Sequence, residues 1–134
     1  MEWIVMKAWE EKGFRIPPPY ERIQKRLLAP DKNKVEELTL SQTIIACNSG
    51  TDYHEHDRSE LMYIVTGRGK TLIEGHEYEL QPDVVLWVPG GIKHQLNNSS
   101  DETMKVVTIF VPAYTAEYLN QRALEATKKA TENE

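Results

Sequence analysis

The chain has 134 residues, of which 40% are hydrophobic and 28% charged. This length is enough for one compact domain and too short for two of ordinary size. A formal net charge of −5, without a cluster of Lys and Arg, disfavours nucleic acid and anionic membranes as partners. The single cysteine, Cys47, excludes an intrachain disulfide framework and is expected to be a small, buried strand residue.

Residues 1–37 are predicted to form an N-terminal arm and a first edge strand. The opening MEWIVMKAWEEKG carries charged residues where a signal peptide needs an unbroken apolar stretch, so we expect a cytoplasmic protein. The prolines at 17–19 cannot lie within a helix or a central strand, and they mark an extended segment. The arm exposes more apolar surface than an isolated tail should, which favours a homodimer formed by partner-strand addition; its apolar residues are Trp3, Ile4, Val5 and Trp9.

Residues 38–113 are predicted to form an all-β core. Short β-like runs are separated by Gly, Pro, Asn, Asp or Ser: LTLSQTIIAC, LMYIVTG, GKTLIEG, HEYEL, DVVLWVP, HQLNN and MKVVTIFVP. Two of these runs form a predicted hairpin that turns near Gly75, and strands at this spacing indicate a sandwich or barrel. Along the strand after Glu60, Met62 and Ile64 share the predicted inward face, while Tyr63 points the other way.

Residues 114–134 are predicted to form a C-terminal helix and a frayed tail. Thr115 is a plausible N-cap, and a narrow apolar stripe follows at steps of three and four residues: Ala116, Leu119, Ala123, Ala126 and Ala130. We expect this helix to pack across the outside of the barrel and the final KKATENE to fray.

The stretch HEHDRSE, which begins at His54, combines residue types that bind metals. Alternate residues of a strand lie about 7 Å apart on one face, so His54 and His56 can converge on one ion. A turn at residues 57–59 would bring the carboxylate of Glu60 back beside the imidazoles, which gives two nitrogens and one oxygen. Charged loops that contain histidine are also common on surfaces, so a solvated loop is the alternative.

A second segment, PDVVLWVPGGIKHQLNN, places His94 after an apolar strand and a Pro-Gly-Gly turn. Together the two segments resemble the cupin superfamily. The first cupin motif, G-x5-H-x-H-x3,4-E-x6-G, is matched by Gly50, His54, His56, Glu60 and Gly67, with three residues in place of five after the first glycine. The second motif, G-x5-P-x-G-x2-H-x3-N, is matched by Pro89, Gly91, His94 and Asn98, while Asp83 stands at its opening glycine.

The resemblance implies a double-stranded β-helix, a jelly-roll barrel of the cupin type that commonly pairs into dimers. It also implies one divalent ion, which could be iron, manganese, nickel, cobalt, copper or zinc, bound by His54, His56, Glu60 and His94. One or two coordination positions would stay open to water or substrate. Pro89, Gly91 and Asn98 are expected to be structural, and His76, in the predicted hairpin turn, is expected to be solvated.

Two functions remain open at this point. The first is a metal-dependent enzyme acting on a small polar molecule, of oxygenase, decarboxylase, isomerase or lyase type. The second is a non-catalytic barrel that binds or senses a small molecule. The complete ligand set favours the enzyme, because four polar groups inside a barrel are costly unless an ion satisfies them. No general acid or base is assigned.

Overall fold

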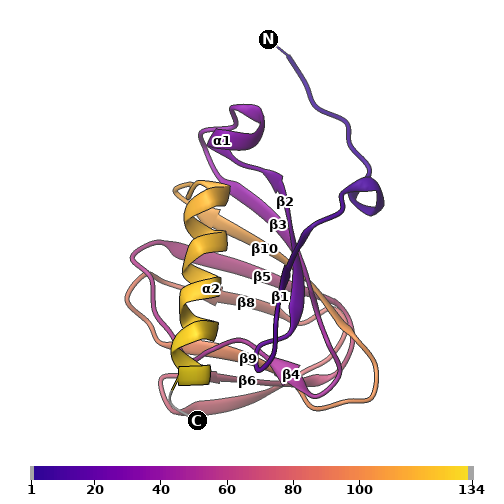
Figure 1. Cartoon of the computed structure of the whole chain (residues 1–134), viewed down its shortest axis with the longest axis vertical. Coiled ribbons are helices and arrows are strands. Elements are labelled where there is room, and N and C mark those ends of the chain that lie inside the picture. Colours follow the sequence, from indigo (N-terminus) through magenta and orange to yellow (C-terminus); the bar gives the residue numbers. More distant parts are fainter. Residues whose placement is uncertain (1, 133–134) are drawn as a thin grey trace.

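The structure, a computed structural model, describes residues 2–132, and Figure 1 shows strands stacked side by side and crossed by one long helix. The strands are β1 (Phe14–Ile16), β2 (Arg22–Leu28), β3 (Thr39–Ile45), β4 (Ser49–Gly50), β5 (Ser59–Thr66), β6 (Gly69–Ile73), β7 (His76–Leu80), β8 (Val85–Val88), β9 (His94–Asn98) and β10 (Met104–Val111). The helical elements are the 3-10 turn η1 (Ala8–Glu10), α1 (Pro30–Asn33) and α2 (Ala116–Glu132). Within residues 2–132, no helix has the length and apolar character needed to cross a membrane.

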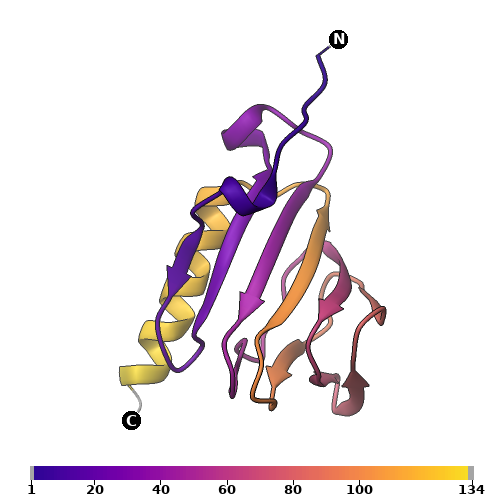
Figure 2. The same ribbon diagram turned by 90° about the vertical axis from the view of Figure 1, so that its right-hand side faces the viewer.

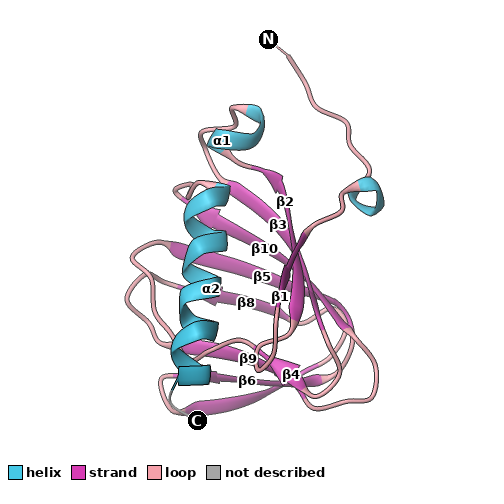
Figure 3. Cartoon of the chain, in the orientation of Figure 1, coloured by secondary structure: helices cyan, strands magenta, loops and turns pink. Residues whose placement is uncertain are grey.

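The strands form two antiparallel sheets, which Figure 3 shows in magenta. The larger sheet has the order β1-β2-β3-β10-β5-β8, and the smaller has the order β4-β9-β6-β7. The predicted hairpin joins β6 to β7, with Ile73 paired to His76 across the turn that contains Gly75. The predicted all-β barrel with a C-terminal helix is therefore confirmed.

One half of the space between the sheets is an apolar core. Its buried residues come from both sheets: Ile45, Met62, Ile64, Leu80, Val88, Leu96, Met104 and Val106. Alternation along β5 places Met62 and Ile64 in this core and leaves Tyr63 exposed on the outer face, as the sequence predicted. Burial of these side chains supplies the main driving force for closing the barrel.

The N-terminal segment contributes two strands to the larger sheet, where the sequence indicated an arm and one edge strand. β2 pairs with β3, and Arg22, Gln24 and Arg26 lie on its inward face. β1 pairs with β2 and forms the edge of the sheet. Ahead of β1, the arm runs away from the sheets, as Figure 2 shows. The larger sheet thus begins before residue 38, the predicted start of the barrel core.

Helix α2 begins after its predicted N-cap, because the hydroxyl of Thr115 accepts a hydrogen bond from the Tyr118 amide at 3.1 Å. Leu119 and Ala123 are buried as predicted, together with Thr127, which the apolar stripe did not include. The predicted position outside the barrel was wrong, because Leu119 and Ala123 line the interior cavity and the helix closes its open side. The helix also continues to Glu132 through most of the predicted frayed tail, whose last two residues lie outside the described residues.

Cys47 is exposed, so its predicted burial in a strand was wrong. β3 ends at Ile45, and Cys47 falls in the following turn, next to Asn48 with φ 56°. The apolar run LTLSQTIIAC suggested a strand that reaches Cys47. The chain instead turns after Ile45, and Asn48 takes the left-handed backbone of this turn.

Candidate metal centre

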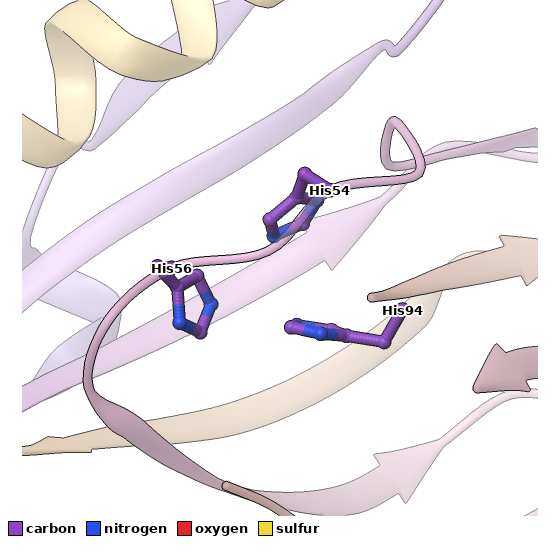
Figure 4. A group of neighbouring side chains, drawn as sticks. All are labelled: His54, His56 and His94. Carbon is purple, nitrogen blue, oxygen red and sulfur yellow. The ribbon is translucent and has the colours of Figure 1, made fainter. Parts of the chain in front are cut away.

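Three histidines gather at the polar end of the barrel interior. His54, His56 and His94 each offer a ring nitrogen, and these nitrogens all lie within 4.8 Å of one another. Figure 4 shows the three rings pointing toward a common space. Their ring centroids are 4.6–5.3 Å apart. The structure thus brings together side chains that are up to forty residues apart in the sequence.

Backbone hydrogen bonds connect the segments that carry these histidines. His54 and His94 form an antiparallel bridge, in which each amide donates to the other's carbonyl oxygen at 3.0 and 2.9 Å. The Gly91 amide donates to the carbonyl oxygen of His56 at 2.8 Å. Because backbone groups fix the relative position of the two segments, the cluster is preorganised before any ion binds.

The turn before His94 depends on two glycines. A Cβ atom at Gly90 would lie 2.6 Å from the carbonyl oxygen of Asp57, so only glycine lets this turn approach the loop after His56. Gly91 has φ +83°, in the left-handed region that favours glycine. The turn is therefore structural, as predicted, and its close approach to the loop is what brings His94 beside His56.

Asp83, which replaces the opening glycine of the second motif, has φ 73°. This is the left-handed backbone that a glycine would adopt, and Asp is among the residues that tolerate it best. Its carboxylate accepts a hydrogen bond from the Tyr63 hydroxyl at 2.6 Å. The departure from the motif thus leaves the backbone path toward β8 intact.

The three imidazoles are held in one orientation by backbone carbonyl groups. Each Nδ1 atom lies within hydrogen-bond distance of a carbonyl oxygen: His54 of Asp52 at 2.7 Å, His56 of Arg58 at 3.0 Å, and His94 of Ile92 at 2.8 Å. A proton on Nδ1 satisfies these contacts and leaves Nε2 with a free lone pair. Metal-binding histidines in proteins are commonly oriented in this way.

Glu60, the second residue of β5, places its carboxylate between two of these rings. Its Oε1 atom lies 3.1 Å from Nε2 of His56 and 3.1 Å from Nε2 of His94. Burial alone would raise the pKa of Glu60, but the hydrogen bonds to the two histidines outweigh it and lower the pKa to about 2. The carboxylate is therefore ionised at neutral pH.

The same environment acts in opposite directions on two of the histidines. Burial lowers the pKa of His54 to about 4, although Asp52 opposes the shift, so this ring is neutral at pH 7. Burial also acts to lower the pKa of His94, but the hydrogen bond to Glu60 outweighs it and raises the pKa. A positive charge between Glu60 and its histidines is thus favoured, whether a proton or a metal ion supplies it.

These donors fit a divalent metal ion. If each Nδ1–H donates to its carbonyl oxygen, the Nε2 lone pairs of His56 and His94 face the Glu60 carboxylate at 3.1 Å. These electron-rich atoms repel one another unless a cation lies between them. Imidazole nitrogens and a carboxylate oxygen form a mixed set that several transition metals accept. Of the four predicted side chains, the three histidines form one group, and Glu60 contacts His56 and His94.

A cavity of about 70 Å³ adjoins the cluster and is lined by all four of these side chains. Aromatic and aliphatic side chains form part of its wall, among them Phe110, Tyr114 and Leu119. Three arginines also line it, Arg22 and Arg26 from β2 and Arg122 from α2. None of the three was predicted from the sequence, because a charged residue in a short strand or on a helix is usually solvated.

The other residues weighed in the sequence take structural or solvated positions. His76 is exposed at the start of β7 and is not among the three grouped histidines. Asn98 is fully buried and makes its hydrogen bonds to backbone carbonyl groups and to Ser100, not to the cluster. Both positions agree with the roles expected for them.

Comparison with known proteins identifies relatives of the whole fold. The family model described as Cupin domain matches residues 43–110. An uncharacterized protein of Methanocaldococcus jannaschii is 27% identical over 118 residues, which cover 85% of this chain and 94% of that protein.

Solved structures show the same architecture. A "predicted oxalate decarboxylase" from Thermotoga maritima has a TM-score of 0.75 at 18% identity, covering 81% of this chain and 99% of that one. Ectoine synthase from P. lautus has a TM-score of 0.76 at 22% identity, covering 90% and 86%. An RmlC-like cupin from Shewanella frigidimarina has a TM-score of 0.69 at 15% identity, covering 87% and 96%. At these identities, the likeness shows a shared fold.

Proposed function

Because this chain belongs to the cupin family, we propose that it is a metal-dependent enzyme acting on a small polar molecule. The proposed ligands of its one divalent ion are His54, His56, Glu60 and His94. The observation that carries the proposal is the fixed orientation of the three imidazoles, whose Nδ1 atoms contact carbonyl groups while Nε2 of two of them faces an ionised carboxylate.

The chain's own residues would hold, orient and enclose the reacting molecule. The backbone carbonyl groups accept the Nδ1 proton of each imidazole and so orient its Nε2 atom toward the site. Phe110, Tyr114 and the helix residue Leu119 form a buried apolar cluster that lines the cavity. A divalent ion bound there would supply a Lewis acid that polarises an oxygen atom of the bound molecule.

The cavity also supports an enzyme over a purely structural metal site. Structural sites are usually closed by protein ligands, whereas catalytic sites keep a position open. Here the four side chains border open space of about 70 Å³. A molecule in that space would reach the ion directly, so the site is built for access as well as for holding the ion.

The first experiment measures metal in protein purified without chelator, by inductively coupled plasma mass spectrometry. The wild type should hold about one divalent ion per chain. His94→Ala and His54→Ala should lose most of it, because each removes one of four ligands. His76→Ala is the matched control, since it removes an exposed histidine and should leave the metal content unchanged.

Unchanged metal content in the His94→Ala protein would contradict the proposed site. Catalysis is tested separately, by measuring oxygen consumption and product formation when the metal-loaded protein is given small acids and sugars. Turnover that is lost in His94→Ala supports the enzyme. Binding of such molecules without any turnover would favour the alternative, a non-catalytic binding or sensing barrel.

We also infer that the chain assembles as a homodimer through its N-terminal arm. Trp3, Val5 and Trp9 are strongly exposed on the arm, and β1, where the arm enters the sheet, is an edge strand. An exposed edge and exposed apolar side chains are both features that a second copy of the chain would cover.

A further inference from the structure

We propose that the molecule held beside the metal centre carries a carboxylate group and that Arg22 and Arg26 bind this group. The inference deepens the proposed function by naming the class of substrate, and it rests on that function for the role of the metal. It is carried by two buried guanidinium groups that face the same cavity as the histidine cluster and form no salt bridge among residues 2–132.

The two arginines are placed by the alternation of β2. Arg22 and Arg26 are four residues apart on one strand and point to the same face, with Gln24 between them, and all three line the cavity. Only 4% of Arg22 and 8% of Arg26 is accessible to solvent. Arginine is almost never buried to this extent unless it is paired, so these positions call for a partner.

The contacts of Arg26 hold it rigidly without neutralising it. Its Nε donates to the Asn120 side chain at 3.0 Å, one terminal nitrogen donates to the hydroxyl of Ser41 at 3.0 Å, and the other contacts the Gln24 side chain. All three acceptors are neutral oxygens. The guanidinium is thus fixed in position while its positive charge remains uncompensated by an ion pair.

Arg22 is less completely satisfied. One terminal nitrogen donates to the Tyr20 carbonyl oxygen at 2.9 Å, and the buried Nε has no hydrogen-bond partner among the described residues. Neither Arg22 nor Arg26 forms a salt bridge within residues 2–132. A buried cation with an unpaired donor is costly, and an anionic ligand would remove that cost.

The two carboxylates of the cavity lie within contact distance of the histidines and form no salt bridge with Arg22 or Arg26 within residues 2–132. Glu60 contacts His56 and His94, and Asp52 lies 3.6 Å from Nδ1 of His54. Burial lowers the pKa of Arg22 and of Arg26 to about 10, although the charge of Asp52 opposes the shift for Arg22 and that of Glu60 opposes it for Arg26, so both stay charged at neutral pH. Three arginines therefore oppose two carboxylates in the lining, and the cavity is positive inside a chain whose net charge is −5.

The chemistry of the lining favours an organic carboxylate over other anions. A guanidinium presents a planar fork that matches the two oxygens of a carboxylate. Phe110, Tyr114 and Leu119 offer apolar contact for a short carbon skeleton, which an inorganic anion would not use. A cavity of about 70 Å³ suits a small molecule. The carboxylate of the bound molecule would contact the arginines, and its reacting oxygen would lie near the histidine cluster.

The test uses the full chain, loaded with metal, in a buffer free of carboxylates. Malonate and acetate are the probes, with acetamide as the neutral analogue and inorganic phosphate as the competing anion. Isothermal titration calorimetry should detect binding of malonate or acetate but no binding of acetamide. Arg22→Met should weaken carboxylate binding about tenfold or more, because it removes a charge-assisted contact. Arg68→Met is the control, since Arg68 is exposed and donates a hydrogen bond to the Gln81 side chain.

Thermal unfolding without a probe separates a binding role from a structural one. Arg22→Met removes a buried charge with an unpaired donor, so the variant should unfold at the same temperature as the wild type or at a higher one. An unfolding temperature equal to or above that of the wild type, together with weaker carboxylate binding, supports the proposal. An unfolding temperature clearly below that of the wild type, with carboxylate binding retained, would overturn it. Arg26→Lys gives a second variant that keeps the charge and loses the planar fork.

Metal content measured on the same samples distinguishes the two proposals. A wild type that holds metal but binds neither malonate nor acetate overturns the carboxylate inference and leaves the metal site standing. Carboxylate binding that depends on Arg22 in a protein without metal supports this inference and contradicts the proposed function. Binding of phosphate in preference to both carboxylates overturns the assignment of the ligand class.

Discussion

Asn98 connects three parts of the chain through one buried side chain. Its Nδ2 atom lies 3.3 Å from the carbonyl oxygen of Ile45, 3.1 Å from that of Ala46 and 2.7 Å from that of Glu102. Its Oδ1 atom accepts hydrogen bonds from the amide and hydroxyl of Ser100. The residue therefore ties the end of β9 to the end of β3 and to the loop that precedes β10.

We predict that Asn98→Ala lowers the free energy of unfolding by about 2 kcal/mol or more, because it leaves buried carbonyl groups without a donor. Asn98→Asp should be worse at pH 7, since an ionised carboxylate would face those same carbonyl oxygens. Urea denaturation measures both changes. Asn97→Ala is the control, because Asn97 is the exposed neighbour on the same strand. Equal stability of the two alanine variants would refute the role assigned to Asn98.

The proposed metal ligands and the arginines differ in how far the sequence could indicate them. His54, His56 and Glu60 lie within seven residues, and His94 follows a distinctive Pro-Gly-Gly turn, so short-range spacing was enough to group them. Arg22 and Arg122 stand a hundred residues apart and belong to no motif. Only the pairing of β2 with β3 and the placement of α2 over the cavity bring them together.

At the scale of elements, strands between residues 38 and 113 were predicted closely and β2 was not. HEYEL and HQLNN coincide with β7 and β9, and MKVVTIFVP contains β10. In β2 the alternation is inverted, because Arg22 and Arg26 point inward while Ile23 is partly exposed. A strand that lines a polar cavity lacks the apolar periodicity by which strands are detected in a sequence.

The start of α2 depends on a residue from a distant element. The carboxylate of Asp31 in α1 accepts hydrogen bonds from the amides of Ala116 at 2.7 Å and Glu117 at 3.1 Å. These amides are among the first of the helix and have no acceptor within it. A negative charge at this end of a helix is also favoured by its dipole. Capping by a residue 85 positions away leaves no local signal in the sequence.

We predict that Asp31→Ala lowers the free energy of unfolding by about 1 kcal/mol at pH 7, the usual cost of losing a helix cap. Burial would raise the pKa of Asp31, but the two backbone amides outweigh it and lower the pKa below its ordinary value of 3.8. The stabilisation is therefore present above the unfolded pKa and is lost as the pH falls through the folded one.

Urea denaturation of the wild type and Asp31→Ala at pH 7 and near pH 3 measures this dependence. The difference between the two proteins should shrink at the lower pH. Glu125→Ala, which removes an exposed carboxylate from the middle of α2, should have little effect at either pH. A difference of the same size at both values would show that the charge of Asp31 does not contribute.

At the scale of the whole molecule, two exposed apolar surfaces are candidates for contact with a second copy. The first is the arm, where Trp3 is 86% exposed and Val5 89% exposed. The second is the outer face of β8 and β5, where Val85 and Trp87 lie opposite Tyr63 and Leu61. The arm extends beyond the body of the molecule in Figure 2, so it can reach a partner without displacing any part of its own barrel.

We predict that the wild type is a homodimer at micromolar concentration and that deletion of residues 1–12 shifts it toward the monomer. The deletion removes Trp3, Val5 and Trp9 and leaves β1, which begins at Phe14, so the barrel should remain folded. Size-exclusion chromatography with light scattering measures the mass, and circular dichroism checks the fold. Trp87→Ser tests the competing surface and should leave the dimer unchanged. A dimer that survives the deletion but dissociates in Trp87→Ser would contradict the arm as the interface. The two copies would then be held together by the outer face of β8 and β5.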